Sequence, residues 1–277
     1  MNYFFIKQYF SLRWKRWLSI IPIIFFTAIL LKYIAPIDFL PANKTLILKD
    51  YIFASLSYPF YILFLAPLLY CYLIYDIVTK DYEGGYISFI ISRIGTRTSY
   101  FISKILLIII TANIYFFINL FILIIVGLIF RLPLQGDSYH EVLNISYKLG
   151  LNIYNIFLIQ YGIYFIGLIV IGISVLVISL LFNNGIYSII FTILCIIQSQ
   201  EAFFNNNRNL RWSLIGQLAL SKHYPFCFSH SQVDPSYLSY MIGYTPYYSI
   251  KFYIAISLIA FLVGILCINK MNFNKKM

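Results

Sequence analysis

The amino-acid sequence predicts an all-α polytopic membrane protein with six transmembrane helices. Of its 277 residues, 61% are hydrophobic and only 10% are charged, and the mean hydropathy is +0.84. Soluble domains typically carry about 25% charged residues, so this chain cannot be water-soluble over most of its length. The uncharged runs 51–75 and 105–130 are each longer than the roughly 20 apolar residues that cross a hydrocarbon core.

Apolar runs separated by charged or turn-forming segments define the six spans. The run 149–200 carries no charge and is long enough for two helices, with Asn183-Asn184-Gly185 as the turn between them. Pro59 and Pro67 lie inside the second span and predict kinks, because proline removes a backbone donor. We expect one transmembrane domain, 1–277, with spans at 18–34, 52–75, 105–130, 158–182, 186–199 and 252–268.

Residues 1–17 form a predicted amphipathic interfacial helix ahead of the first span. Lys7, Gln8, Ser11 and Lys15 share one face of a helical wheel, and apolar and aromatic side chains cover much of the remainder. Such a helix lies along the membrane surface. A basic anchor that sets the topology is an equally good interpretation of the same residues.

The net charge of +11 comes from 20 Lys and Arg residues against 9 Asp and Glu residues. The basic residues flank apolar spans, so we interpret them as topology signals and lipid-headgroup contacts and expect no nucleic-acid partner. Eleven of them fall in the short segments 1–17, 76–104 and 270–277, which leaves nine (20 − 11) for the longer loops. Short loops and the first flank dominate topology, so both termini are predicted to be cytoplasmic.

The segment 76–104 joins the second and third spans and is predicted to be a cytoplasmic coupling loop. Asp81 and Glu83 precede two turns of apolar helix, and Arg93 and Arg97 follow them, a polarity that suits the helix dipole. Exposed apolar side chains on so short a helix are unfavourable in water unless they meet a groove on another protein. The pattern therefore predicts a docking helix.

The order of acidic residue, glycine, apolar helix, Thr96-Arg97, aromatic residue and lysine resembles the permease subunit of ATP-binding-cassette exporters of the type-2 permease family. The layout of the whole chain is similar too, including the long extracytoplasmic loop 201–251. In that family the loop is the coupling helix, which sits in a cleft of the ATPase. The chain departs from the family at Ile94-Gly95, where a proline is common. The coupling residues that the resemblance implies are Glu83, Gly85, Tyr86, Phe89, Ile90, Arg93, Arg97 and Lys104.

The resemblance implies the membrane-spanning subunit of an ATP-driven exporter in a bacterial cytoplasmic membrane. A separate ATP-binding-cassette ATPase subunit would hold ATP and magnesium, so no cofactor and no enzymatic activity are expected in this chain. A second permease copy or a paralogue would complete the pore. The implied substrate is an amphiphile, such as an antimicrobial peptide, a lipid or a drug. A stand-alone membrane carrier or a lipid-modifying membrane enzyme is the competing interpretation.

Motifs that the sequence lacks favour an energy source outside the chain. There is no GxxxxGK[ST] phosphate-binding loop, and Gly84-Gly85 is not followed by the lysine of that motif. No Asp, Glu, Lys, Arg or His lies in the middle of a predicted span, where ion-coupled carriers place such groups. An HExxH motif and a Ser/His/Asp cluster at membrane depth are also missing, which weakens the enzyme interpretation.

One loop collects residue types that bind metals. His223, Cys227, His230 and Asp234 lie within twelve residues of one another in the last extracytoplasmic loop. Their spacing fits no strong metal motif, and Pro225 interrupts it, so we expect no metal site there.

Small and polar residues inside the spans predict helix packing. Gly162, Gly167 and Gly172 recur on the fourth span, and small residues let helix backbones approach closely. Polar side chains in the spans either line a substrate path or form hydrogen bonds between helices, the second use being more common. The candidates are Asn113, Asn119, Gln160 and Thr192.

Overall fold

The computed structural model describes residues 2–41, 43–83, 87, 90–91, 95–148, 152–223 and 239–270. Throughout these residues the regular structure is helical, without strands. Within the same residues, six helices are long and apolar enough to cross a membrane. The predicted all-α class is thereby confirmed, and the six candidate helices suggest a multi-pass membrane protein.

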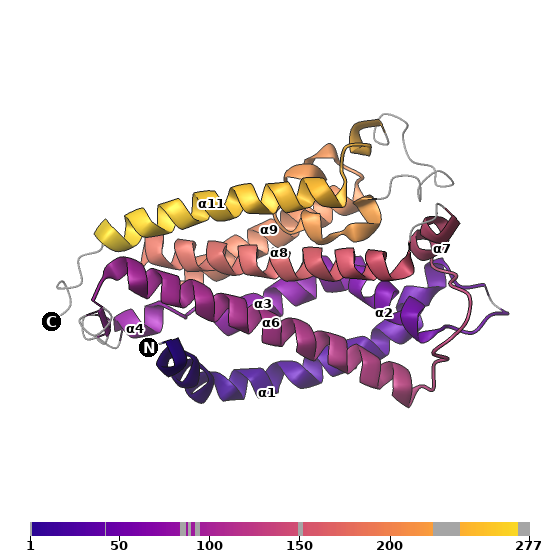
Figure 1. Cartoon of the computed structure of the whole chain (residues 1–277), viewed down its shortest axis with the longest axis horizontal. Coiled ribbons are helices and arrows are strands. Elements are labelled where there is room, and N and C mark those ends of the chain that lie inside the picture. Colours follow the sequence, from indigo (N-terminus) through magenta and orange to yellow (C-terminus); the bar gives the residue numbers. More distant parts are fainter. Residues whose placement is uncertain are drawn as a thin grey trace.

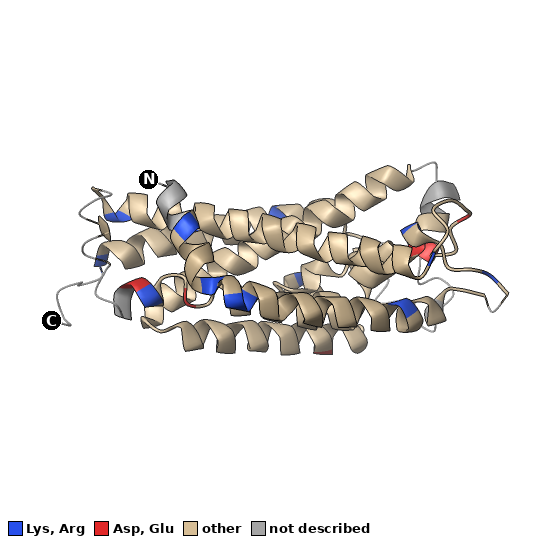
Figure 2. Cartoon of the chain, turned by 90° about the horizontal axis from the view of Figure 1, so that it is seen from below, with Lys and Arg blue, Asp and Glu red and all other residues tan. Residues whose placement is uncertain are grey.

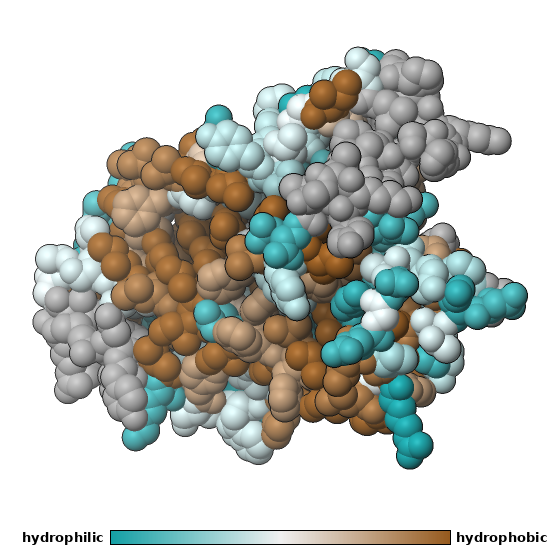
Figure 3. Space-filling view, turned by 45° about the vertical axis from the view of Figure 1, so that its right-hand side comes forward, coloured by the Kyte–Doolittle hydropathy of each residue, from teal (hydrophilic) through white to brown (hydrophobic). Residues whose placement is uncertain are grey.

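The long helices run roughly alongside one another (Figure 1). The start of α1 and the end of α11 lie at the same end of this bundle, together with α4, whereas α2 and α7 lie at the other end. Charged residues are sparse along the middle of the bundle (Figure 2), and hydrophobic side chains cover much of the face seen in Figure 3. The candidate spans are Ile6–Ile37, Tyr61–Asp81, Arg97–Ile129, Ile153–Phe182, Gly185–Phe204 and Pro246–Lys270.

The first span corrects the prediction of a separate interfacial helix at 1–17. Helix α1 (Asn2–Ile34) is one uninterrupted helix of 33 residues that includes both segments. Arg13 and Trp17, expected at the membrane surface, are buried in the protein. Arg13 pairs with Asp76, 63 residues away. The Arg13 charge is therefore neutralised inside the protein, and the helix does not have to bend along the membrane surface to place it among lipid headgroups.

The two prolines of the second span interrupt it as predicted. Helix α2 (Leu48–Ser57) ends before Tyr58, which is extended at φ −66° and ψ 124°, the conformation that a following proline favours. A π-helical turn, η2 (Tyr61–Leu65), then leads into α3 (Ala66–Ile74). The candidate span covers Tyr61–Asp81, and α2 precedes it on the other side of the interruption.

Side-chain caps set the limits of the next helices. Helix α6 (Arg97–Ile129) begins eight residues before the predicted span (105 − 97), because the Thr96 hydroxyl accepts a hydrogen bond from the Ser99 N–H at 3.1 Å. The predicted turn at residues 183–185 is present between α8 (Ile153–Phe182) and α9 (Gly185–Phe204). Asn183 adopts the left-handed conformation there, at φ +52°.

The helices that contain the predicted spans 158–182, 186–199 and 252–268 are all longer than those spans. Helix α11 extends over Pro246–Lys270 and α9 ends at Phe204, so the connection between them is shorter than the predicted 201–251. Its described part contains three 3-10 turns, and α7 precedes α8 on the same end of the bundle. These elements are η3 (Arg208–Trp212), η4 (Gly216–Leu218), η5 (Leu220–His223) and α7 (Glu141–Lys148).

Helix α8 is the central helix, in contact with α11, α9, α6 and α3. Two of its glycines allow close packing, as predicted. A Cβ atom at Gly172 would lie 2.5 Å from Ile108 Cγ2 and 2.9 Å from the Tyr70 hydroxyl, and one at Gly167 would lie 2.3 Å from Leu218 Cδ2. At Gly162 a Cβ atom would meet nothing within 4 Å, so the prediction of close packing is wrong for this third glycine.

Candidate functional site at the charged end of the bundle

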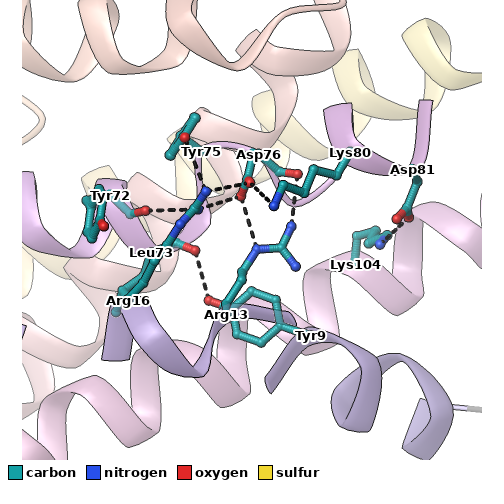
Figure 4. Close-up of polar contacts among 10 residues, drawn as sticks. All are labelled: Tyr9, Arg13, Arg16, Tyr72, Leu73, Tyr75, Asp76, Lys80, Asp81 and Lys104. Carbon is teal, nitrogen blue, oxygen red and sulfur yellow. Dashed lines mark hydrogen bonds and ion pairs between the residues drawn. The ribbon is translucent and has the colours of Figure 1, made fainter. Parts of the chain in front are cut away.

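Charged side chains of α1 and of the turn after α3 meet at the end of the bundle that holds α4. Arg13 and Arg16 are three residues apart and therefore share one face of α1. Both guanidinium groups donate to the carboxylate of Asp76, which lies two residues after α3 (Figure 4). We call Arg13, Arg16, Asp76 and the nearby Lys80 the Asp76 cluster.

The geometry of the Asp76 cluster is that of a buried, multiply bonded ion pair. Arg16 is bidentate, with Nη1 2.9 Å from Asp76 Oδ1 and Nη2 2.8 Å from Oδ2. Arg13 Nε lies 3.1 Å from Oδ1, and its Nη2 donates to the Asp76 backbone carbonyl at 3.1 Å. Lys80 Nζ is 3.6 Å from Oδ2. Because Asp76 is only 4% exposed, these bonds replace its hydration.

Aromatic side chains enclose the two arginines. The Arg13 guanidinium lies over the Tyr9 ring, 4.7 Å from its centroid, and Arg16 lies over the Tyr75 ring at 4.8 Å. The Tyr9 hydroxyl donates to the Leu73 carbonyl at 2.9 Å, and the Tyr75 hydroxyl accepts from Arg16 at 3.2 Å. Cation–π contacts and hydrogen bonds therefore hold α1 against the end of α3.

A second buried ion pair joins α4 to α6. Lys104 Nζ lies 2.5 Å from Asp81 Oδ2, and the Tyr100 hydroxyl donates to the same oxygen at 2.9 Å. Lys104 is 4% exposed. Arg97, at the start of α6, donates to the Asn269 carbonyl near the end of α11 at 2.7 Å. The segment between α4 and α6 is thus attached to the bundle on both sides.

Four of the predicted coupling residues lie outside the described residues: Gly85, Tyr86, Phe89 and Arg93. Glu83 ends α4, and the other three predicted residues contact the rest of the chain. Arg97 and Lys104 bond to the chain itself, as above.

Ile90 corrects the expectation of an exposed docking residue. It is 7% exposed and belongs to the same apolar core as Ile87. The two isoleucines are three residues apart, so the spacing puts both on one face, which is buried against the bundle.

The sequence reasoning missed the Asp76 cluster. The sequence patterns place Asp76 at the border of the 76–104 segment and the two arginines in an interfacial helix. The available signal was the spacing of Arg13 and Arg16 on one helical face, together with an acidic residue at the end of a neighbouring apolar run. Their pairing depends on a contact between residues 63 positions apart, which spacing alone does not reveal.

Three of the four polar residues proposed for a substrate path form hydrogen bonds inside the bundle. Gln160 donates to the Ser57 hydroxyl at 2.7 Å, and Thr192 donates to the Ser188 carbonyl at 2.8 Å. Asn119 accepts from the Tyr61 hydroxyl and donates through its amide to a backbone carbonyl of its own helix. Asn113 is different, because its side chain lies on the outer surface.

Of the loop residues with metal-binding side chains, His223 is described, whereas Cys227, His230 and Asp234 lie outside the described residues. The His223 ring is buried and stacked on Tyr244, with centroids 4.2 Å apart. Its nitrogens lie 3.0 Å from the Ala219 carbonyl and 2.6 Å from the Ser249 hydroxyl. Burial lowers the pKa of His223 to about 4, so the ring is neutral at neutral pH.

The carboxylates of Asp76 and Asp81 are each held by a basic partner on another helix, so neither is placed as a free acid or base. The arrangement is suited to a mechanical connection among α1, α3, α4 and α6. In comparisons with known proteins, the chain matches no family model, no curated protein and no solved structure.

Proposed function

We propose that the chain is the membrane-spanning subunit of an exporter for an amphiphilic substrate, driven by a separate ATP-binding-cassette ATPase. The ATPase, which holds ATP and magnesium, docks at the end of the bundle that carries the Asp76 cluster. The observation that carries the proposal is the pair of buried ion-pair sites just before the segment between α4 and α6, which tie Asp76 to α1 and Asp81 in α4 to Lys104 of α6.

A docking segment can drive transport only if its displacement moves the spans. The Asp76 cluster links the turn before α4 to α1, and the Asp81–Lys104 pair links α4, where the segment begins, to α6. Removing one partner of a buried ion pair costs about 3–5 kcal/mol, several times the thermal energy of about 0.6 kcal/mol. A displacement of the segment is therefore passed to both helices before the ion pairs break.

The placement of charge also favours an external motor. In the candidate spans, the charged residues that the structure describes lie toward the helix ends, and α8 has none over its 30 residues. Carriers driven by protons or cations need titratable groups on the ion path inside the membrane. The carboxylates nearest the spans at this end, Asp76 and Asp81, are already paired with basic residues.

The spacing of the segment supports two faces with different roles. Ile87 and Ile90 lie in the chain's own core. Phe89 and Arg93 are four residues apart, so on a helix they share a face that adjoins the one with Ile87 and Ile90, and Tyr86 lies between the two. We assign this second face to the groove of the ATPase, with Glu83 and Gly85 at the start of the segment.

The test is co-purification of the tagged chain from its native membranes in mild detergent. Phe89→Ala combined with Arg93→Glu removes an apolar anchor and reverses a charge on the proposed docking face. We expect an ATPase with a phosphate-binding loop to accompany the unaltered chain and to be lost from this double variant.

The matched control is Leu134→Ala combined with Arg131→Glu. These two residues are exposed in the loop after α6, at the opposite end of the bundle, and should retain the ATPase. Gel filtration of all three proteins checks that the fold is kept. Purification of the unaltered chain without an ATPase would favour a stand-alone carrier or enzyme, and retention of the ATPase by Phe89→Ala/Arg93→Glu would remove the docking role.

A further inference from the structure

Asn113 lies at the midpoint of α6, sixteen residues from each end of the helix (113 − 97 and 129 − 113). Its side chain is exposed, although the structure buries Asn119, Gln160 and Thr192. The nearest charged residue along the helix is Lys104, nine residues away (113 − 104), or about 13 Å at 1.5 Å per residue. Asn113 is therefore within the hydrocarbon depth of the membrane.

The face of α6 around Asn113 is apolar. Its neighbours on this face follow the four- and seven-residue spacing of one helical stripe. These exposed side chains are Ile102, Leu106, Phe117, Phe121 and Leu128.

The amide of Asn113 has no hydrogen bond to any described residue, whereas the amide of Asn119 bonds to its own helix and to Tyr61. Leaving an amide without partners in an apolar medium costs several kcal/mol, and lipid tails offer neither donors nor acceptors. The Asn113 amide on this face of α6 therefore needs a hydrogen-bonding partner from another molecule.

We infer that this face of α6 is the contact between two copies of the chain, with the two Asn113 amides bonded to each other. A carboxamide is both donor and acceptor, so two of them are self-complementary. Two copies inserted in the same direction and related by a two-fold axis along the membrane normal hold residue 113 at one depth. A different partner would need a matching polar residue at that depth, whereas a second copy has one by identity.

The proposed function calls for a second permease, and the inference rests on that proposal. It identifies the second permease as an identical copy and places the contact between the two copies at α6. It does not depend on the ATPase. Self-association of the purified chain can therefore be tested alone, and its failure leaves the co-purification experiment unaffected.

The first experiment measures dimerisation of the purified chain in lipid vesicles by energy transfer between labelled copies. Interhelical hydrogen bonds in membranes contribute about 1–2 kcal/mol in model peptides, so Asn113→Leu should weaken self-association roughly 5- to 30-fold. The apolar replacement is compatible with a lipid-facing position and should leave the fold intact. Asn113→Gln keeps both hydrogen-bonding functions and should retain most of the association.

The second experiment reports which face is in contact. In a background where all four native cysteines are replaced by serine or alanine, Phe117→Cys should form an intermolecular disulfide under mild oxidation. Leu258→Cys, on the exposed face of α11, is the matched control and should stay monomeric. Unchanged association of Asn113→Leu, or crosslinking through Leu258→Cys instead of Phe117→Cys, would overturn the inference. Labelling of Asn113→Cys by a membrane-impermeant thiol reagent would overturn it too, since it would show a water-lined path.

Discussion

At one end of the molecule, the single carboxylate of Asp76 pairs with three basic side chains. Two arginines and a lysine contact this carboxylate, Arg13 also donates to the Asp76 backbone carbonyl, and Arg13 is only 5% exposed. A guanidinium at that depth depends on its anion, because water is not available to replace it. Without Asp76, Arg13 and Arg16 would have to reach the lipid headgroups, as a predicted interfacial helix requires.

Asp76→Asn keeps the size of the side chain and removes its charge. We expect the free energy of unfolding to fall by about 3–5 kcal/mol, the usual cost of removing one partner of a buried ion pair. Thermal unfolding of the detergent-solubilised protein, followed by a thiol-reactive dye that reaches the buried Cys71 only after unfolding, measures the change. Asp137→Asn, in an exposed loop, is the control. Equal melting temperatures for the two variants would contradict this account of the Asp76 cluster.

At the scale of whole elements, local signals located most of the helices. Uncharged length predicted six spans, the prolines predicted the interruption around η2, and Asn183-Asn184-Gly185 predicted the turn before α9. The limits of α1 and α6 could not be predicted from charge, since Arg13 and Lys104 extend into the bundle with partners on other helices. For the same reason the candidate site was only partly foreseen. Arg97 and Lys104 were singled out, whereas the pairing of Asp76 depends on tertiary contact.

Two glycines of α8 provide a matched test of helix packing. Gly172→Ala places a methyl group 2.5 Å from Ile108 and 2.9 Å from the Tyr70 hydroxyl, so we expect a loss of about 1–3 kcal/mol from overpacking. Gly162→Ala meets open space and should be neutral or stabilising by up to about 1 kcal/mol, because alanine favours the helix. The melting temperature of Gly172→Ala should therefore fall, whereas that of Gly162→Ala should stay the same or rise. A similar loss at both positions would show that α8 packs differently.

The whole molecule has two unlike ends. At one end lie the start of α1, α4, the Asp76 cluster and the end of α11; at the other lie α2, α7 and the 3-10 turns (Figure 1). The even number of candidate spans agrees with both termini on one side, and the distribution of Lys and Arg predicts that this side is cytoplasmic. In our proposal, the ATPase docks at this end and a second copy contacts α6 within the membrane.

The most direct measurement is photo-crosslinking in intact cells from a photoreactive phenylalanine analogue at position 89. If a motor docks on the segment between α4 and α6, irradiation should join this position to an ATPase with a phosphate-binding loop. The same analogue at Leu134, exposed at the opposite end, should give no such product. Crosslinks from position 89 only to lipid or to the chain itself, or access to this position from outside the cell, would contradict the proposal.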